Sequence, residues 1–347
     1  MIKKLIVAIL LLVALASART SNLSFEETQF REFQLKYNKH YESHEFAQKL
    51  ATFKNSLKRI QELNDMAKRA KVDTEFGVNK FADLSKEEFA NYYLNKGGME
   101  STDSETYAPD YSDKEISNLP TSFDWRTQGA VTPVKDQGQC GSCWSFSTTG
   151  NVEGQWFLAG NDLTGLSEQN LVDCSTKNDG CNGGLMPLAY DYIVENNGID
   201  TEASYPYLAI QQKNCQFNPA NIGAKIDGYY NVSSNETQMQ INLVNNGPLS
   251  IAADAAEWQY YKKGIFSGIF GICGKNLDHG ILIVGYGQQT TEFGTELFWI
   301  IKNSWSTDWG LSGFMLIKRG TGECGINLAV TSAYVDTPPS SKKKLLN

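Results

Sequence analysis

The hydrophobic positions of the chain form three differently patterned stretches, and the first is an unbroken run near the N-terminus. Leu5–Leu15 is apolar, follows two lysines and precedes the small residues Ala16, Ser17 and Ala18. This arrangement is typical of a secretory signal peptide that is cut after Ala18. The run is shorter than the ~20 residues that span a bilayer, which makes a retained anchor the less favoured alternative. We therefore expect a signal peptide at residues 1–18 and no membrane span later in the chain.

The second stretch runs from Ser24 to about Lys96 and has the period of a helix. Apolar residues recur every three or four positions from Phe46 to Leu63, while lysine, arginine and glutamate occupy the opposite face. Such a stripe predicts an amphipathic helix. Ser24 and the glutamate three positions later form a capping box, and a second, short helix is expected from Ser85. This region is therefore predicted to be mostly helical.

The pattern weakens at Gly97 and changes again at Leu119. Residues 97–118 are acidic, rich in serine and threonine and poor in aliphatic residues, which predicts an extended connector. Residues 144–174 have a helical pattern, whereas the runs after about residue 225 are short, β-like and separated by glycines. Helices followed by strands predict an α+β body in two halves, with a cleft between them. The expected divisions are 1–18 (signal peptide), 19–118 (helical region with its connector) and 119–347 (main domain, mainly helical at about 119–228, mainly β at about 229–335, with a basic, solvated tail at 336–347).

Composition and charge narrow the class of partner and the redox compartment. A chain of 347 residues is long enough for two domains. Its net charge of −8 argues against a nucleic-acid partner, since such partners usually leave a basic footprint. A signal peptide implies an oxidising compartment, in which cysteines pair. The chain has seven cysteines, all after position 139, so at least one thiol should stay unpaired.

Cys140 and Cys143 stand three positions apart, and this spacing allows four interpretations. A zinc site needs two more ligands at suitable spacing, and Cys174 and Cys181 do not form a second knuckle. A redox pair needs a βαβ setting, which the pattern lacks. A direct disulfide would close a very tight ring. The fourth interpretation places Cys140 in a structural disulfide and leaves Cys143 free as a nucleophile.

A nucleophilic thiol needs a group that stabilises its thiolate, because the thiolate is the reactive form. Cys143 begins a predicted helix, and His279 is the one histidine of the main domain. An imidazolium beside the thiolate would stabilise it and supply a general acid. Asn303 is a candidate to orient the ring without adding a charge, with Trp305 shielding the bond from water. A lone histidine before an apolar strand is also commonly structural, and this alternative stays open.

The motifs around these residues resemble those of papain-family (C1) cysteine peptidases of the cathepsin L type. The matching segments, in chain order, are DWR, VTPVKDQGQCGSCWSFS, GCNGG, DHGILIVGYG and KNSWSTDWG. CGSCW is a signature of the papain-type nucleophile. The resemblance runs from about Ser24 to Tyr334. It implies a papain-like two-lobed fold, with a helical left lobe, a β-barrel-like right lobe and an active-site cleft between them, preceded by a helical inhibitory prodomain.

The resemblance also implies an activity and a set of partners. The chain would be the preproenzyme of a cysteine endopeptidase, made as a zymogen and activated by removal of its propeptide, with no metal or cofactor. Its partners would be protein and peptide substrates, its own propeptide and cystatin-type inhibitors. It would act as a monomer in a lysosome, in a lysosome-like acidic vacuole or outside the cell. A binding-only relative without catalysis is the alternative from another class, and inhibition of proteases by the separate propeptide is a second candidate activity.

Carried onto this sequence, the family pattern assigns Cys143 as nucleophile, His279 as acid and base, and Asn303 as the residue that orients the imidazole. Gln137 would lend its side-chain amide to an oxyanion hole, beside the Cys143 backbone N–H. The positions of the S2 pocket are all apolar, which predicts a preference for Leu, Phe or Val at P2; they are Leu185, Met186, Ala252, Leu277 and Ala329. The implied disulfides are Cys140–Cys181, Cys174–Cys215 and Cys273–Cys324, which leaves Cys143 free.

The region before Leu119 resembles the family's inhibitory propeptide. Its helix motif is partly kept, with departures that would weaken its own fold: the kept residues are Glu45, Phe53, Ile60 and Asn64, and the replaced ones are Lys49, Thr52 and Ser56. The shorter motif G-x-N-x-F-x-D is intact and ends at Asp83. Asp83 and the acidic connector suggest activation by acid, with cleavage near Leu119. His40 and His44 are expected on the surface of this region.

Two further features of the sequence bear on the surface and the backbone. Asn22, Asn231 and Asn235 begin N-x-S/T glycosylation sequons, and the last two fall in a segment expected at the surface. Ser306 stands where the family usually has glycine.

Overall fold

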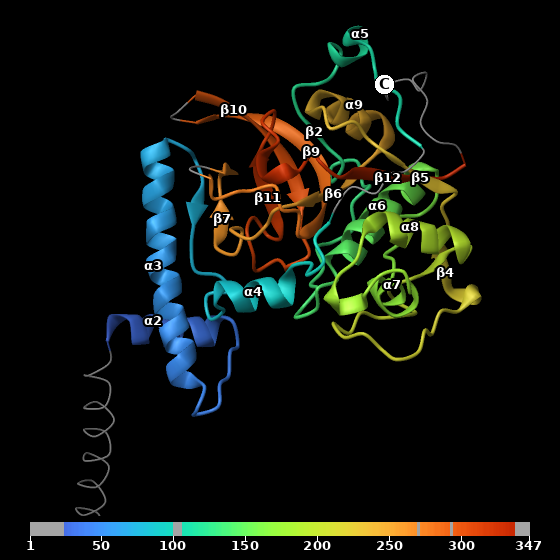
Figure 1. Ribbon diagram of the computed structural model, residues 1–347. Helices are drawn as coiled ribbons and strands as arrows, with labels where there is room; N and C mark the ends of the chain where they lie inside the picture. The colour runs from blue at the N-terminus through green and yellow to red at the C-terminus, as the bar shows by residue number, and fades with distance from the viewer. Residues whose placement is uncertain (1–23, 100–105, 269–270, 292–293, 337–347) are drawn as a thin grey trace, which may run out of the picture.

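A computed structural model of the chain describes residues 24–99, 106–268, 271–291 and 294–336 (Figure 1). The expected signal peptide, the sequon at Asn22 and nearly all of the basic tail lie outside these residues. Among the helices that are described, none is long and apolar enough to cross a membrane. Residues 24–118 are called the N-terminal module below, and the described residues from 119 onward the main module.

The N-terminal module is mostly helical, and the main module places most of its helices before most of its strands. The elements, in chain order, are α2 (Phe25–Lys36), α3 (Phe46–Ala70), β1 (Glu75–Phe76), α4 (Lys86–Tyr93), α5 (Asp113–Ile116), β2 (Phe123–Asp124), α6 (Cys143–Leu158), α7 (Glu168–Cys174), η1 (Gly180–Asn182), α8 (Met186–Glu195), β3 (Ile199–Asp200), η2 (Pro219–Asn221), β4 (Ile222–Ala224), β5 (Gly228–Asn231), α9 (Glu236–Asn246), β6 (Leu249–Ala253), β7 (Tyr261–Lys263), β8 (Ile265–Phe266), β9 (His279–Thr291), β10 (Gly294–Lys302), β11 (Phe314–Lys318), η4 (Glu323–Gly325) and β12 (Val330–Tyr334).

The N-terminal module is built on the long helix α3, which α2 crosses near its first turns (Figure 1). The predicted apolar stripe is confirmed, because Phe53, Ile60 and Leu63 are buried along α3. Phe53 packs against Phe30 and Phe33 of α2, with ring centroids 5.3 and 5.1 Å apart. Aromatic pairs at this spacing stabilise a packing beyond the area they bury. Phe53 thereby gives the module its own small core, whereas Ile60 and Leu63 belong to the core that the module shares with the main module.

The residues that depart from the family's helix motif are well partnered. Lys49 donates to Glu88 Oε1 at 2.9 Å and to the backbone oxygen of Asp83 at 3.2 Å. Glu88 also closes the capping box at the start of α4. Ser56 makes a 2.9 Å hydrogen bond with the hydroxyl of Tyr260 in the main module. These contacts join α3 to α4 and to the main module, so they do not support the expected weakening.

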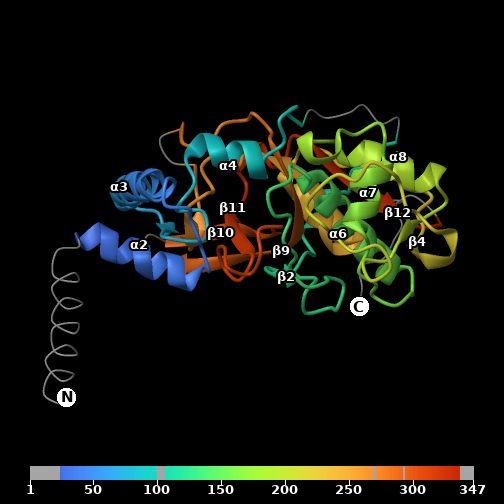
Figure 2. The ribbon, with the colours of Figure 1, turned by 90° about the horizontal axis from the view of Figure 1, so that it is seen from below.

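One large sheet forms the strand-rich half of the main module. Its strand order is β5-β12-β6-β9-β10-β11-β8, with β2 pairing to β9. β9 is the central strand for the site, because it pairs with β6 and β10 and packs against α6. Figures 1 and 2 show α6, α7 and α8 grouped beside the strands, so the predicted α+β body in two halves is confirmed.

The helices of the main module differ from the expectation in two ways. The helical pattern over 144–174 is confirmed as two helices rather than one stretch, because α6 ends at Leu158 and α7 begins at Glu168, where Ser167 is the N-cap. Gly160, with φ +94°, has a backbone conformation that favours glycine and ends the helix. A helix also stands among the predicted strands, because Asn235 caps α9 by accepting from the Thr237 N–H.

The connector is partly ordered, although its composition predicted an extended linker. Residues 106–118 contain the short helix α5, which begins with a capping box of Ser112 and Glu115. Ala108 and Tyr111 are buried against the main module. The average composition of the connector therefore did not predict the few specific contacts that order it.

Ser306 should be replaceable by glycine with a gain in stability. Its φ of +65° lies in the left-handed region, which costs an L-residue about 1–2 kcal/mol. Glycine avoids this steric cost, but it loses about 0.5–1 kcal/mol more chain entropy on folding. We expect Ser306→Gly to raise the free energy of unfolding by about 0.5–1 kcal/mol. Urea unfolding of the full chain measures this. Ser234→Gly, at an exposed serine outside the left-handed region, is the control and should not stabilise.

Candidate active site

Cys143 is the first residue of α6 and is fully buried. It is the free cysteine among the seven, because the other six form the disulfides Cys140–Cys181, Cys174–Cys215 and Cys273–Cys324. Burial raises the pKa of the Cys143 thiol to about 12, although a hydrogen bond from the Gly280 backbone acts in the opposite direction. The thiol is therefore held neutral in this form of the protein.

His279 is the first residue of β9, and the next residue, Gly280, lies against the start of α6. A Cβ placed on Gly280 would lie 3.2 Å from the Cys143 backbone oxygen. His279 Nε2 is 2.8 Å from Asn303 Oδ1. Because an amide oxygen only accepts, Nε2 carries the proton and Nδ1 is the bare nitrogen of the neutral ring. Nδ1 has no hydrogen-bond partner among the described residues, so it is free to take a proton.

An apolar wall surrounds the imidazole. Trp305 stacks on His279 with ring centroids 4.5 Å apart and an interplanar angle of 26°. Trp258 approaches the same ring edge-on at 6.3 Å. Burial lowers the pKa of His279 to about 4, and the Asn303 bond only partly offsets this. A thiol with a raised pKa beside an imidazole with a lowered pKa favours the neutral pair.

Gln137 lies beside the N-terminus of α6, and Ser304 holds its side chain in place. Ser304 Oγ donates to Gln137 Oε1 at 2.7 Å, and the Ser304 N–H donates to Asn303 Oδ1 at 2.7 Å. Gln137 Nε2 is thereby aimed away from Ser304, where it donates to the backbone oxygens of Tyr93 and Cys140 at 3.1 and 3.0 Å. One of these two acceptors, the Tyr93 oxygen, belongs to the N-terminal module. Ser304 was not among the site residues predicted from the sequence, in which only its position inside the KNSW motif indicates a role.

The segment after α4 crosses the site from one half of the main module to the other (Figure 2). The Asn95 N–H donates to the Asp278 oxygen at 2.6 Å on the strand side, and Asn95 Nδ2 donates to the Gly184 oxygen at 2.7 Å on the helical side. The Met99 N–H donates to the Leu277 oxygen at 2.8 Å. These bonds use mostly backbone groups, so no side-chain motif announced them. The segment that they hold in place covers Cys143 from solvent.

The predicted S2 residues lie together. Met186, Ala252, Leu277 and Ala329 belong to one buried apolar cluster with Cys143, and Leu185 packs against it. Met99 of the N-terminal module belongs to the same cluster and is 2% exposed. A methionine side chain is therefore buried with these residues and Cys143.

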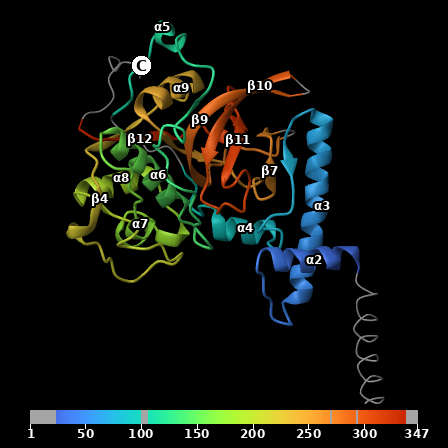
Figure 3. The ribbon, with the colours of Figure 1, turned by 180° about the vertical axis from the view of Figure 1, so that it is seen from behind.

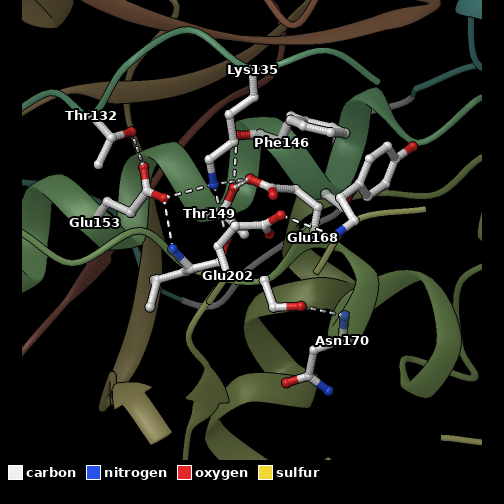
Figure 4. Close-up of polar contacts among 12 residues, drawn as sticks. Thr132, Lys135, Phe146, Thr149, Glu153, Glu168, Asn170 and Glu202 are labelled. Atoms are coloured by element: carbon white, nitrogen blue, oxygen red, sulfur yellow. Dashed lines mark hydrogen bonds and ion pairs between the residues drawn. The ribbon is translucent and has the colours of Figure 1, made fainter. Parts of the chain in front are cut away.

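A cluster of buried charges, which the sequence analysis missed, lies behind α6 (Figure 4). Lys135 Nζ donates to Glu153 Oε1 at 3.1 Å and to Glu168 Oε1 at 2.7 Å, and Thr149 also donates to Glu168. Burial raises the pKa of Glu168 to about 7. A cavity of about 20 Å³ separates this cluster from Asn303 and its neighbours. The cluster ties α7 to α6, and it thereby fixes the helix that carries the thiol.

One of the expected surface sequons is buried. Asn231 is 5% exposed within β5, so the expectation of a surface position is wrong for this residue. Asn235 is exposed at the start of α9. Within the described ranges, no three His, Cys, Asp or Glu side chains gather where they could hold a metal ion.

Comparison with known proteins agrees with this geometry. The papain family cysteine protease model matches residues 119–334, and the cathepsin propeptide inhibitor domain (I29) matches residues 30–89. Cysteine proteinase 1 of Dictyostelium discoideum is 52% identical over 323 residues, which cover 89% of this chain and 93% of that protein. Cathepsin L of Sarcophaga peregrina is 41% identical, with coverage of 96% and 99%.

Solved precursor structures share the fold. Digestive procathepsin L 3 of the Tenebrio molitor larval midgut has a TM-score of 0.77 at 37% identity, over 90% of this chain and 100% of that one. Recombinant stem bromelain precursor has a TM-score of 0.80 at 33% identity, with the same coverage. The chain therefore belongs to the papain family of cysteine proteases and is a zymogen that carries a cathepsin-type inhibitory propeptide.

Proposed function

We propose that the mature enzyme is an endopeptidase in which Cys143 is the nucleophile, His279 the acid and base, and Asn303 the residue that orients the imidazole. The observation that carries this proposal is that the free Cys143 begins α6 and lies against Gly280, the residue that follows His279, whose Nε2–H is fixed by Asn303. The presence of Gln137 at the same site argues against a binding-only relative, which would need no oxyanion donor.

Each step of the proposed reaction uses a group already named. Once the propeptide leaves, water and the peptide enter, and the Cys143 proton passes to His279 Nδ1. The thiolate attacks the carbonyl carbon, and the Gln137 amide and the Cys143 N–H stabilise the oxyanion. The imidazolium gives its proton to the leaving amine, which leaves an acyl-enzyme. The imidazole then takes a proton from the water that attacks the thioester carbon. The C–S bond breaks, the carboxylic acid product leaves, and the imidazolium returns its proton to the thiolate.

The assignment of Cys143 is tested by titrating acid-activated protein with the epoxide inhibitor E-64 and mapping the labelled peptide. One equivalent bound at Cys143, with loss of peptide hydrolysis, is the expected result. Labelling at another residue, or no labelling of correctly processed protein, would overturn the assignment and favour the binding-only alternative.

The apolar character of the S2 residues supports the preference for Leu, Phe or Val at P2, and the burial of Met99 among them supports it further. Ala329→Glu should shift this preference toward arginine. A carboxylate among apolar residues rewards a cationic side chain and penalises leucine. We expect the ratio of kcat/KM for Arg over Leu at P2 to rise about tenfold or more. Paired fluorogenic substrates measure the ratio. Ala329→Gln, of similar size but uncharged, is the control, and an equal shift in both variants would contradict the charge argument.

Acid activation is proposed to act through carboxylates that hold the propeptide. Within the propeptide, Asp83 accepts from Lys39 Nζ at 3.0 Å and from the Tyr41 hydroxyl at 2.9 Å. Across the interface, Glu75 pairs with Lys262 at 2.6 Å and Lys263 at 2.9 Å. Protonation removes the charge from each of these contacts, after which cleavage near Leu119 is expected to separate the two modules.

Glu75→Gln should speed activation at mildly acidic pH. Hydrogen bonds from Lys262 and then Lys263 lower the pKa of Glu75 below 4.5. A lowered pKa in the bound state means that the contact stabilises the bound propeptide above pH ~4.5 and is lost as the pH falls through the lowered value. Because exposed ion pairs are weak, we expect activation about two- to fivefold faster at pH 5–6 and little difference below pH 4. The time course of processing on gels measures this.

Two controls make the pH dependence specific. Glu32→Gln changes an exposed glutamate on α2 and should leave the rate unchanged at every pH. An acceleration of Glu75→Gln that persisted in full at pH 3.5 would contradict the ion-pair explanation.

The proposed activity also implies a cellular destination and a set of partners. We propose entry into the secretory pathway through residues 1–18 and delivery to a lysosome, a similar acidic vacuole or the cell exterior, because the three disulfides need an oxidising compartment. The mature enzyme is proposed to act as a monomer on protein and peptide substrates, with its propeptide and cystatin-type inhibitors as further partners.

A further inference from the structure

The connector after residue 106 is attached to the main module by a site that the reaction does not use. Tyr111 is 4% exposed. Its N–H donates to Gln238 Oε1 at 2.8 Å, and its C=O accepts from Gln238 Nε2 at 2.9 Å. Asn246 Nδ2 donates to the Tyr111 hydroxyl at 3.1 Å. One residue of the connector thus makes two backbone hydrogen bonds and one side-chain hydrogen bond with α9.

The side chains that bind Tyr111 belong to an ordered row of amides on α9. Gln238, Asn242 and Asn246 recur every four residues, so they lie on one face of the helix. They are at most 9% exposed in the zymogen. Asn242 Nδ2 donates to the Gln238 backbone oxygen at 2.9 Å, and Asn246 Nδ2 donates to Asn242 Oδ1 at 3.0 Å. These bonds hold the row of amides in place, and all three residues belong to the main module.

A sheet edge continues the same attachment. β5 is the terminal strand of the large sheet. The Ala108 N–H donates to the Asn231 oxygen at 2.8 Å, and the Asn231 N–H donates to the Thr106 oxygen at 2.9 Å. Tyr107 forms a parallel bridge with Asn231. The connector therefore extends the sheet by one short segment, a common mode of peptide recognition.

This attachment lies away from the cleft. α5 and α9 lie at the upper edge of the main module in Figures 1 and 3, whereas α4, which leads into the cleft, lies along its lower edge. The propeptide is therefore held at two places, the cleft and the face formed by β5 and α9. The two attachments belong to one chain, so each raises the effective concentration of the other.

We propose that the β5–α9 face remains a peptide-binding site after activation and holds the excised propeptide through its connector, residues 106–118. This rests on the proposed function, in which cleavage near Leu119 frees the connector. The amide of Gln238 pairs with any extended backbone, and Asn246 adds recognition of a phenol hydroxyl. The site is thus fitted to an extended peptide that carries a tyrosine, and the released connector is that peptide.

The test uses a fluorescein-labelled peptide of residues 106–118 and the mature enzyme, obtained by activating the full chain and then blocked with E-64. The block removes the cleft as a competing site. Saturable binding measured by fluorescence anisotropy is expected, at least tenfold weaker for the peptide with Tyr111→Ala. The control peptide with Tyr107→Ala, at a tyrosine that is 59% exposed, should bind within twofold of the parent. A peptide variant has no fold to lose, so this comparison stands on its own.

Variants of the enzyme locate the site. Gln238→Ala should weaken binding at least tenfold, whereas Gln240→Ala, whose Oε1 accepts from Arg319, should not; thermal unfolding confirms that both variants fold. Absence of saturable binding, equal binding of the Tyr111→Ala peptide, or a mature chain whose N-terminus precedes residue 106 would each overturn the inference. The E-64 titre of the activated protein is measured separately, so failure of the peptide to bind is distinguishable from failure of the proposed catalysis.

Discussion

Cys143 should be alkylated by iodoacetamide at least 1,000-fold faster in the mature enzyme than in the zymogen at pH 6. In the zymogen, burial raises the pKa of the thiol to about 12, so the reactive thiolate is almost absent at that pH. Burial also lowers the pKa of His279 to about 4, so little imidazolium is present to stabilise the thiolate. Removing the propeptide lets water reach both groups, which reverses both shifts and favours the charged pair.

Mass spectrometry of the Cys143 peptide over time measures both rates. The zymogen is kept intact at pH 6 by adding the alkylating agent before any acid step, and its integrity is read from the intact mass. The peptides with disulfide cysteines should stay unmodified in both forms, which controls for unfolding. Equal rates in the two forms would mean that the propeptide blocks substrates without changing the ionisation of the thiol.

The sequence was most informative where one physical pattern determines one element. The period of the apolar residues between Phe46 and Leu63 predicted α3, because a long helix with one buried face leaves a regular record. The helical pattern over 144–174 predicted both α6 and α7, but it did not show that α6 ends before Gly160, because the pattern is helical on both sides of the turn. α9 was missed because polar side chains such as Gln238 and Asn246 are buried on it and blur the stripe.

Some features of the site could likewise be predicted from the sequence, and others could not. The odd cysteine count predicted a free thiol, and the rarity of histidine left His279 as the one candidate base in the main domain; the resemblance then supplied their roles. The contacts between the N-terminal module and the site could not be predicted, because Tyr93 contributes a backbone oxygen and Met99 a backbone N–H in addition to its side chain. The connector failed for a related reason, since an acidic, serine-rich average says nothing about the single buried tyrosine, Tyr111.

His279→Ala should lower kcat of the mature enzyme by about 10³-fold or more. The imidazole has two tasks in the proposed reaction, to take the proton from Cys143 and to give it to the leaving amine, and positioned acid–base groups contribute about 10²–10⁴-fold. His279 is the one histidine after His44 in the chain, so no other imidazole can substitute. The loss should appear mainly in kcat, because the ring contacts Asn303 and Trp305 rather than the apolar S2 residues. Steady-state hydrolysis of a fluorogenic peptide, after activation by added wild-type enzyme that is then removed, measures both constants.

The pH profile separates a catalytic role for His279 from a structural one. Without the imidazolium, the pKa of the Cys143 thiol should return toward the value of an ordinary thiol, near 8.5. Alkylation of His279→Ala should therefore be slow at pH 5 and recover as the pH rises toward 9. Asn303→Ala, which keeps the imidazole but frees its ring, should lose less activity and retain fast alkylation in acid. If His279→Ala were alkylated in acid as fast as the parent, the thiolate would owe its stability to the start of α6 alone, and the assignment of His279 as its partner would be wrong.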